Sequence, residues 1–198
     1  MLNLKIMKRT LIIIAFSTAQ IVWCQTPVLP LSTYEDIPNG AYLQDLNNSF
    51  GQYIGIWEGT LNNKKYTFEF TKFEQHYDDF SLCYEDILKS KFRVTDITSG
   101  TIEYDGLSAS DYDDYRILTI PPPSNGMLHC FFTDTDANCR NELEFYLRNI
   151  NGQPNKLTYC NFRYTDEWGL PGIECVDYAD RMDIPVFLPM QDLILTKL

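Results

Sequence analysis

Histidine is scarce in this sequence, and so are the motifs that most often carry catalysis. The chain of 198 residues has two histidines, His76 and His129, and no Gly-x-Ser-x-Gly motif of the kind found in serine hydrolases. The thiol nearest in sequence is Cys130, but adjacent residues on a strand point to opposite faces, so His129 would not meet it. Acids are plentiful, yet none is singled out as a buried carboxyl with a raised pKa. The sequence therefore favours a protein without catalytic activity and suggests no cofactor.

Positive charge is also scarce, because 16 Lys and Arg stand against 27 Asp and Glu, giving a net charge of −11 at pH 7. A surface of this sign repels a phosphate backbone, so nucleic acid is not an expected partner. An anionic membrane surface is disfavoured for the same reason. Beyond the first residues no segment is long and apolar enough to cross a bilayer, so no transmembrane segment is expected.

The first 24 residues have the pattern of a cleavable signal peptide. Lys5, Lys8 and Arg9 form a positively charged start, and the apolar run Leu11–Phe16 is well short of the ~20 residues that span a bilayer. The sequence therefore predicts an exported protein, secreted or periplasmic, in three parts. These are a signal peptide over 1–24, an extended N-terminal arm over 25–49 and a single β-barrel domain over 50–198.

Cys24 leaves two outcomes open for the mature N-terminus. Cleavage before Gln25 places Val22 and Cys24 at the −3 and −1 positions, which a signal peptidase accepts. The loss of three leader cations then leaves 13 Lys and Arg against 27 acids, a net charge of about −14. In the minority alternative Cys24 is lipidated and anchors the protein to a membrane, although Trp23 stands where the lipoprotein peptidase prefers a small residue.

Six cysteines in an exported chain indicate disulfides, because the destination is oxidising. Without Cys24 five remain, so at least one stays free or pairs between chains. Cys130 and Cys139 flank a polar loop between two strand-like runs, which favours a cross-strand bridge. Cys160 with Cys175 is the second candidate pair, and the connectivity stays open. Neither spacing fits a zinc site, which needs close pairs of Cys or His.

One acidic loop matches a calcium site only in part. Asp134, Asp136 and Asn138 repeat oxygen ligands at every second position, as an EF-hand loop does. The positions where that loop needs Gly and Glu hold Cys and Phe, so the EF-hand match fails. A simpler oxygen cage that includes Glu142 is a weak alternative, and otherwise no metal is expected.

Alternating polar and apolar residues predict β-strands through most of the chain. In the clearest case Tyr66, Phe68 and Phe70 share one face, and the Asn-Asn pair at 62–63 before them marks a hairpin turn. Tyr84–Lys89 is the only segment predicted as a helical turn. Many short strands at this spacing indicate an antiparallel sandwich or barrel. Eight or nine strands are expected, within residues 53–60, 65–73, 91–95, 101–104, 115–120, 127–133, 142–148, 157–164 and 193–197.

The segment Thr165–Met190 does not follow this rhythm. It is long, contains Trp168, Cys175 and several prolines, and shows no period. One interpretation is a surface excursion held down by Trp168 and Cys175, and the other is a lid over a binding site. Both remain open at this point.

The two ends of the strand series resemble those of lipocalin-like barrels. Gly55-Ile56-Trp57 is similar to the Gly-x-Trp that opens the first strand in that superfamily, where the tryptophan plugs the closed end and a cation from the last strand packs over its indole. Here Lys197 is the residue that fits this role. The resemblance implies an all-β fold, an antiparallel lipocalin-like (calycin-type) β barrel of about eight strands. It also implies an N-terminal arm, a long loop before the last strand, and structural roles for Gly55, Trp57 and Lys197.

The chain as a whole is similar to an uncharacterised family of exported bacterial proteins, domain of unknown function 6705. The matching features are the leader, Gln25-Thr26-Pro27, the segment Phe50–Trp57, and the end of the chain from Ile184-Pro185 through Leu193–Lys197. This resemblance implies export and fold but supplies no site. The cysteine-bearing stretch 165–190 departs from the family's pattern.

The expected function follows from the high content of aromatic residues. The 12 Phe and 13 Tyr can line a barrel interior and bind a ligand there, or they can fill it. The first expectation is a non-catalytic binding module for a small apolar or amphipathic ligand held in the barrel mouth, with no ligand-binding residue singled out. The alternative is a structural or envelope-interaction protein with a filled barrel, and a hydrolase comes third.

Overall fold

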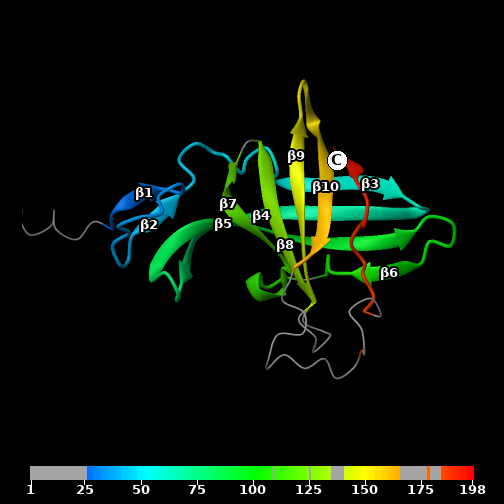
Figure 1. The fold of residues 1–198 in the computed structure, drawn as a ribbon, viewed down its shortest axis with the longest axis horizontal. Helices are drawn as coiled ribbons and strands as arrows, with labels where there is room; N and C mark the ends of the chain where they lie inside the picture. Colours follow the sequence, from blue (N-terminus) through cyan, green and yellow to red (C-terminus); the bar gives the residue numbers. More distant parts are fainter. Residues whose placement is uncertain (1–25, 109, 125, 135–140, 166–177, 179–183) are drawn as a thin grey trace, which may run out of the picture.

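The computed structural model describes residues 26–108, 110–124, 126–134, 141–165, 178 and 184–198. Within these residues the chain is all-β apart from one short 3-10 helix, η2 (Tyr112–Asp114) (Figure 1). The strands form one 11-stranded sheet. Their bounds are β1 Val28–Pro30, β2 Tyr42–Gln44, β3 Gly55–Leu61, β4 Lys64–Asp78, β5 Cys83–Asp96, β6 Ile102–Asp105, β7 Ile117–Ser124, β8 Met127–Asp134, β9 Asn141–Ile150, β10 Gln153–Tyr164 and β11 Leu193–Lys197.

Eight of these strands close into an antiparallel barrel. From β7 to β11 each strand pairs with the next, β11 pairs with β3 through Lys197 opposite Trp57, and β3, β4 and β5 continue the series. The barrel closes where β5 pairs with β7, with Lys89 opposite Leu118 and Ser90 opposite Ile117. The predicted fold class, an antiparallel lipocalin-like barrel of about eight strands, is therefore confirmed. The strands β1, β2 and β6 lie outside the closed ring.

The predicted strands all overlap observed ones, but the predicted helical turn over Tyr84–Lys89 is wrong. That segment is the first part of β5, which pairs with β4 along almost its whole length. Asp86, Leu88 and Ser90 are fully buried on the inner side, and Ile87 and Lys89 are buried on the outer side, so both faces of this part of the strand are covered. The predicted turn at 62–63 is correct, since both asparagines have positive φ, as a tight hairpin requires.

Aromatic side chains fill the part of the barrel interior that the structure describes. Phe68 lies at the centre, with its ring centroid 5.6 Å from that of Phe92, 6.3 Å from Phe70 and 6.1 Å from Tyr159. Tyr159 in turn stacks on Phe145 at 4.5 Å. Each of these side chains is almost completely buried. The interior is therefore a packed core, built from the inward positions of strands β4, β5, β9 and β10.

Both ends of the barrel are also occupied by side chains. At the end where β3 begins, Trp57 is fully buried and its Nε1 donates a hydrogen bond to the carbonyl of Tyr53, 2.7 Å away. At the other end Tyr104 of β6 stacks on Phe92 at 4.4 Å, and Phe187 packs against Tyr104 at 5.1 Å. The last residues of the predicted loop 165–190 therefore pack into the barrel mouth, whereas Trp168 and Cys175 lie outside the described residues.

The predicted N-terminal arm joins the sheet. Its strands β1 and β2 pair in parallel, and β2 pairs in parallel with the first residues of β5, Tyr42 lying opposite Tyr84. Figure 1 shows these strands at one side of the barrel, where β4 and β5 extend beyond it. Parallel pairing of three-residue strands leaves no periodic signal in the sequence, so these strands were not predicted.

A buried carboxylate, Asp86, ties this extension to the barrel. It accepts hydrogen bonds from the Tyr42 hydroxyl and from the backbone N–H groups of Asp45 (3.0 Å) and Gln75 (3.3 Å), and its Oδ2 lies 2.9 Å from Nζ of Lys72. Burial alone would raise the pKa of Asp86, but the hydrogen bonds from Tyr42, Lys72 and the backbone outweigh it, so the pKa is lowered from 3.8. The group therefore stays ionised and fully partnered.

Truncation of the central ring tests whether the interior is packed. We expect Phe68→Ala to lower the free energy of unfolding by about 3–5 kcal/mol, because it opens a cavity among the surrounding rings. The control is Phe80→Ala, since Phe80 is 97% exposed at the tip of the β4–β5 hairpin and should change stability by less than about 0.5 kcal/mol. Urea unfolding measures both. Equal costs for the two variants would contradict a packed interior.

Asp86→Asn tests the buried carboxylate and its pH dependence. A lowered pKa in the folded state means that Asp86 contributes stability above its unfolded pKa, and that this contribution is lost as pH falls through the folded pKa. We expect Asp86→Asn to cost on the order of 3 kcal/mol near neutral pH, because Lys72 loses its buried partner and keeps only the exposed Glu74. The difference from wild type should shrink as the pH falls below about 4. Unfolding measured against pH, with the exposed Asp114→Asn as control, checks this, and a difference that is constant with pH would refute it.

Candidate functional site

The residues with predicted structural roles meet at one end of the barrel. Nζ of Lys197 lies 5.3 Å from the centroid of the Trp57 ring, and the two residues are opposite each other in the β3–β11 ladder. Gly55 has φ of +119°, and a Cβ on it would lie 3.0 Å from Cε of Lys197. A glycine is needed here for two reasons, namely the positive φ and the space that the lysine stem occupies.

The described cysteines, Cys83, Cys130 and Cys160, are buried, and no disulfide joins any two of them. Cys130 is fully buried inside the barrel and Cys160 lies on β10. Burial raises the pKa of both thiols, so neither is an activated nucleophile. Cys139 and Cys175, their predicted disulfide partners, lie outside the described residues, and both pairings stay predictions.

The weak calcium candidate also falls mainly outside the described residues. Asp136 and Asn138 are among those not described, and of Asp134 only the backbone is described, as the last residue of β8. Over the described ranges no group of three or more His, Cys, Asp or Glu side chains is placed to hold a metal ion.

The two histidines lie on separate strands, and neither is placed next to a thiol. His129 is on the outer face of β8, where it stacks on Tyr146 at 4.3 Å and hydrogen-bonds to Glu144, while the thiol of Cys130 is buried on the inner side. This agrees with the expectation that the two side chains do not meet. His76, on β4, stacks on Tyr112 at 3.8 Å.

Glu144 is tied into an ion-pair cluster with His129 and Arg163. Burial acts to raise the pKa of Glu144, but the hydrogen bonds from Arg163 and His129 lower it, and the net pKa lies below the ordinary value. A carboxylate held in this way is a weak base, which suits a structural contact better than proton transfer. The cluster adds little support for an enzyme.

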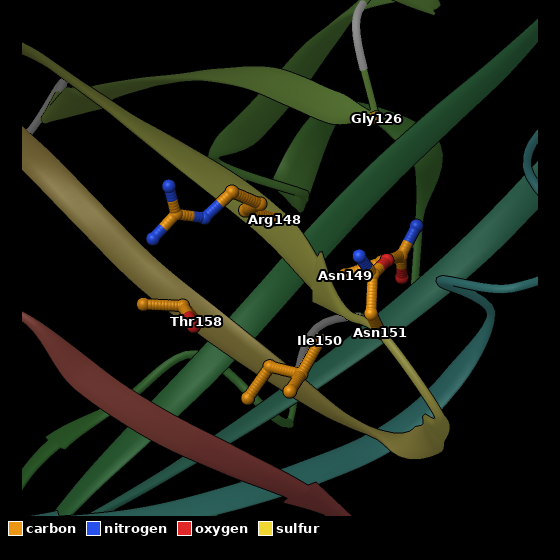
Figure 2. Close-up of a pocket in the computed structure, with 6 residues that line it drawn as sticks. All are labelled: Gly126, Arg148, Asn149, Ile150, Asn151 and Thr158. Atoms are coloured by element: carbon orange, nitrogen blue, oxygen red, sulfur yellow. The ribbon is translucent and has the colours of Figure 1, made fainter.

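An open groove lies beside the β9–β10 hairpin, which projects past its neighbours (Figure 1). It has a volume of about 530 Å³ and contains one cation and no acid. Figure 2 shows Arg148 and Thr158 extending from neighbouring strands, with Ile150 nearer the hairpin end. The lining residues are Gly126, Arg148, Asn149, Ile150, Asn151 and Thr158.

Strand alternation explains how the groove is built. Arg148 and Thr158 are opposite each other in the β9–β10 ladder and lie on the outer face, while the neighbouring Leu147 and Leu157 are fully buried inside. The side-chain amide of Asn149 donates a hydrogen bond to the hydroxyl of Tyr53 at 3.4 Å, which fixes it from within. The sequence did not single out these residues, because one arginine and a turn-rich Asn-Ile-Asn-Gly run carry no motif.

Among the described residues, one buried side-chain polar atom of the interior lacks a hydrogen-bond partner. The hydroxyl of Tyr159 is buried and has no hydrogen-bond partner among the described residues. Burial raises the pKa of this phenol well above its ordinary value, so the group stays neutral. A buried hydroxyl without a partner is uncommon and marks a place where a water or a ligand atom would fit.

Gly55→Ala tests the contact between Gly55 and Lys197. The matched control is Gly152→Ala, because Gly152 also has positive φ (75°) but has nothing within 4 Å of an added Cβ. We expect the control to cost about 1 kcal/mol of unfolding free energy from the backbone alone, and Gly55→Ala to cost at least about 2. Shortening the lysine in the double variant Gly55→Ala/Lys197→Ala should recover part of the difference. Equal costs for the two glycine variants, measured by urea unfolding, would contradict a close contact.

Comparisons with known proteins identify a family and nothing beyond it. A family model described as a family of unknown function, DUF6705, matches residues 7–198. No curated protein and no solved structure gives a significant match. In the part of the chain that the structure describes, none of the helices has the length and apolar character to cross a membrane.

Proposed function

We propose that this chain, which belongs to the family of unknown function DUF6705, is an exported, non-catalytic binding module that holds a small amphipathic ligand in the groove beside the β9–β10 hairpin. The observation that carries the proposal is the contrast between this groove and the barrel interior. The groove is open and mixes polar side chains with an isoleucine, whereas the described interior is filled with aromatic rings. Export rests on the leader pattern of residues 1–24 and on the acidic composition.

The packed interior argues against the barrel lumen as the main site. An eight-stranded barrel can be filled by its own side chains or can hold one small ligand. Here Phe68, Phe92, Phe145 and Tyr159 pack against one another at the centre. A ligand entering at the mouth would also have to displace Phe187 from Tyr104. The position first expected for the ligand is therefore already occupied by the chain itself.

The groove has the features of a small-molecule site. Its volume of about 530 Å³ lies within the range of roughly 300–1,000 Å³ typical of ligand pockets. Arg148, Thr158 and Asn151 offer hydrogen-bond donors, and Ile150 offers apolar surface. A ligand with a polar end and an apolar end matches this lining, whereas a purely apolar ligand would leave the donors without partners.

A second candidate keeps the ligand inside the barrel, and the Tyr159 hydroxyl favours it. This hydroxyl is buried and lacks a partner within the described residues, so a ligand oxygen could accept its hydrogen bond. In this case Phe187 would act as the side chain that moves aside. The two candidates place the ligand on opposite sides of the barrel wall, and blocking variants can separate them.

Binding of prodan, a neutral amphipathic dye whose fluorescence responds to polarity, tests the proposal. We expect Thr158→Tyr, which fills the groove, to weaken binding at least about tenfold, and Phe187→Ala in the mouth to leave it unchanged. The control is Thr60→Tyr, at an exposed position on β3. If Phe187→Ala changes the affinity and Thr158→Tyr does not, the interior candidate holds instead. A wild-type protein that does not bind the dye would refute both.

A further inference from the structure

From the charges around the groove we infer that its ligand carries a carboxylate head group, held by the guanidinium of Arg148; the inference rests on the proposed function. It adds the chemical class of the ligand, which groove size and polarity leave undefined. Three features lead to it: two cations that form no ion pair with a described residue, the donors next to them, and the apolar surface on either side.

Arg148 forms no ion pair with an acid that the structure describes, whereas six other described cations do. Nζ of Lys64 lies 2.6 Å from Glu103, and the guanidinium of Arg93 lies 3.0 Å from Asp105. Lys65, Lys72, Lys91 and Arg163 also have carboxylates within ion-pair distance. In a chain with 27 acids, an exposed arginine that forms no ion pair with any described residue is available for an external anion.

Lys156 adds a second positive charge on the same face. It precedes Thr158 by two residues on β10 and therefore points to the same side of the sheet. It likewise forms no ion pair with a residue that the structure describes, and the groove lining itself contains no acid. The groove lining is thus a local positive site on an acidic molecule, where an anion is attracted.

The geometry of the donors favours a carboxylate over a neutral polar group. Arg148 presents a planar fork that matches two carboxylate oxygens, and the hydroxyl-bearing Thr158 is its direct neighbour across the β9–β10 ladder. A doubly charged phosphate is less suitable, because the net charge of −11 repels a dianion more strongly than a monoanion.

Apolar surface for the rest of the ligand lies on both sides of these donors. Ile150 follows Arg148 by two residues on β9 and shares its face. Ile194 is opposite Thr158 in the β10–β11 ladder and is 48% exposed. An alkyl chain attached to the carboxylate would cover one of these isoleucines, so the expected ligand is a short amphipathic acid.

Calorimetric titration with octanoate, octanol and octyl phosphate tests the inference on the full chain without its leader. Wild type should bind octanoate at least about tenfold more tightly than octanol, because only the acid pairs with Arg148. Arg148→Gln should remove this preference, because it weakens octanoate binding far more than octanol binding. Lys65→Gln, which removes an exposed cation that already has a partner, should keep the preference. Raising the salt from about 0.05 M to about 0.5 M should weaken octanoate binding and leave octanol binding unchanged.

Failure of the inference differs from failure of the proposed function. If octanoate and octanol bind equally well and Arg148→Gln has no effect, the groove binds amphipathic molecules but not through a carboxylate, and the inference is overturned. Tighter binding of octyl phosphate than of octanoate overturns the assignment of the head group. If none of the three compounds binds, the proposed function fails and the inference fails with it.

Discussion

The barrel closes across one short seam, and the rest of the structure depends on how that seam is held. β5 has a single free edge, which β2, β7 and β6 share in turn, so only two residue pairs join β5 to β7. Side-chain hydrogen bonds add to the two residue pairs of this short ladder. The buried hydroxyl of Thr119 donates to the carbonyl of Leu88 at 2.7 Å, and Nζ of Lys89 donates to the carbonyl of Tyr112 at 2.7 Å.

Lys89 is a buried cation whose contacts with Tyr112 help to hold the seam together. It is buried on the outer side of β5 under η2, where its Nζ also lies 3.7 Å from the centroid of the Tyr112 ring. Burial lowers the pKa of Lys89, and the carbonyl and the ring face compensate for lost hydration. Lys91 repeats the contact with Tyr115 at 5.1 Å. Two lysine–tyrosine contacts therefore hold η2 and the residue after it against the outer side of β5. These contacts stabilise the place where β5 pairs with β7 and the barrel closes.

Strands could be predicted from the sequence where polar and apolar residues alternate, and β5, the strand at the seam, alternates only in part. Alternation predicted β4 because its inner face is aromatic and much of its outer face is polar. It failed for the first half of β5, where the inner side holds Asp86 and Ser90 and the outer side holds Ile87, because η2 and the N-terminal strands cover this region. The contact of Lys197 with Trp57 could be anticipated from a resemblance. The groove could not, since only the positions of the described acids show that none of them forms an ion pair with Arg148.

Aromatic content alone does not say where a ligand would bind, because 25 Phe and Tyr residues can line a cavity or fill one. The ring contacts of Phe68 favour filling, and a filled barrel is a rigid support whose binding surfaces lie outside. The groove then depends on hairpins of unequal length. Register shifts occur near the ends of both hairpins beside it, between Ile120 and Ser124 and between Gln153 and Leu157. Such irregularities end regular pairing close to the hairpin tips, next to the position on β9 where Arg148 is exposed.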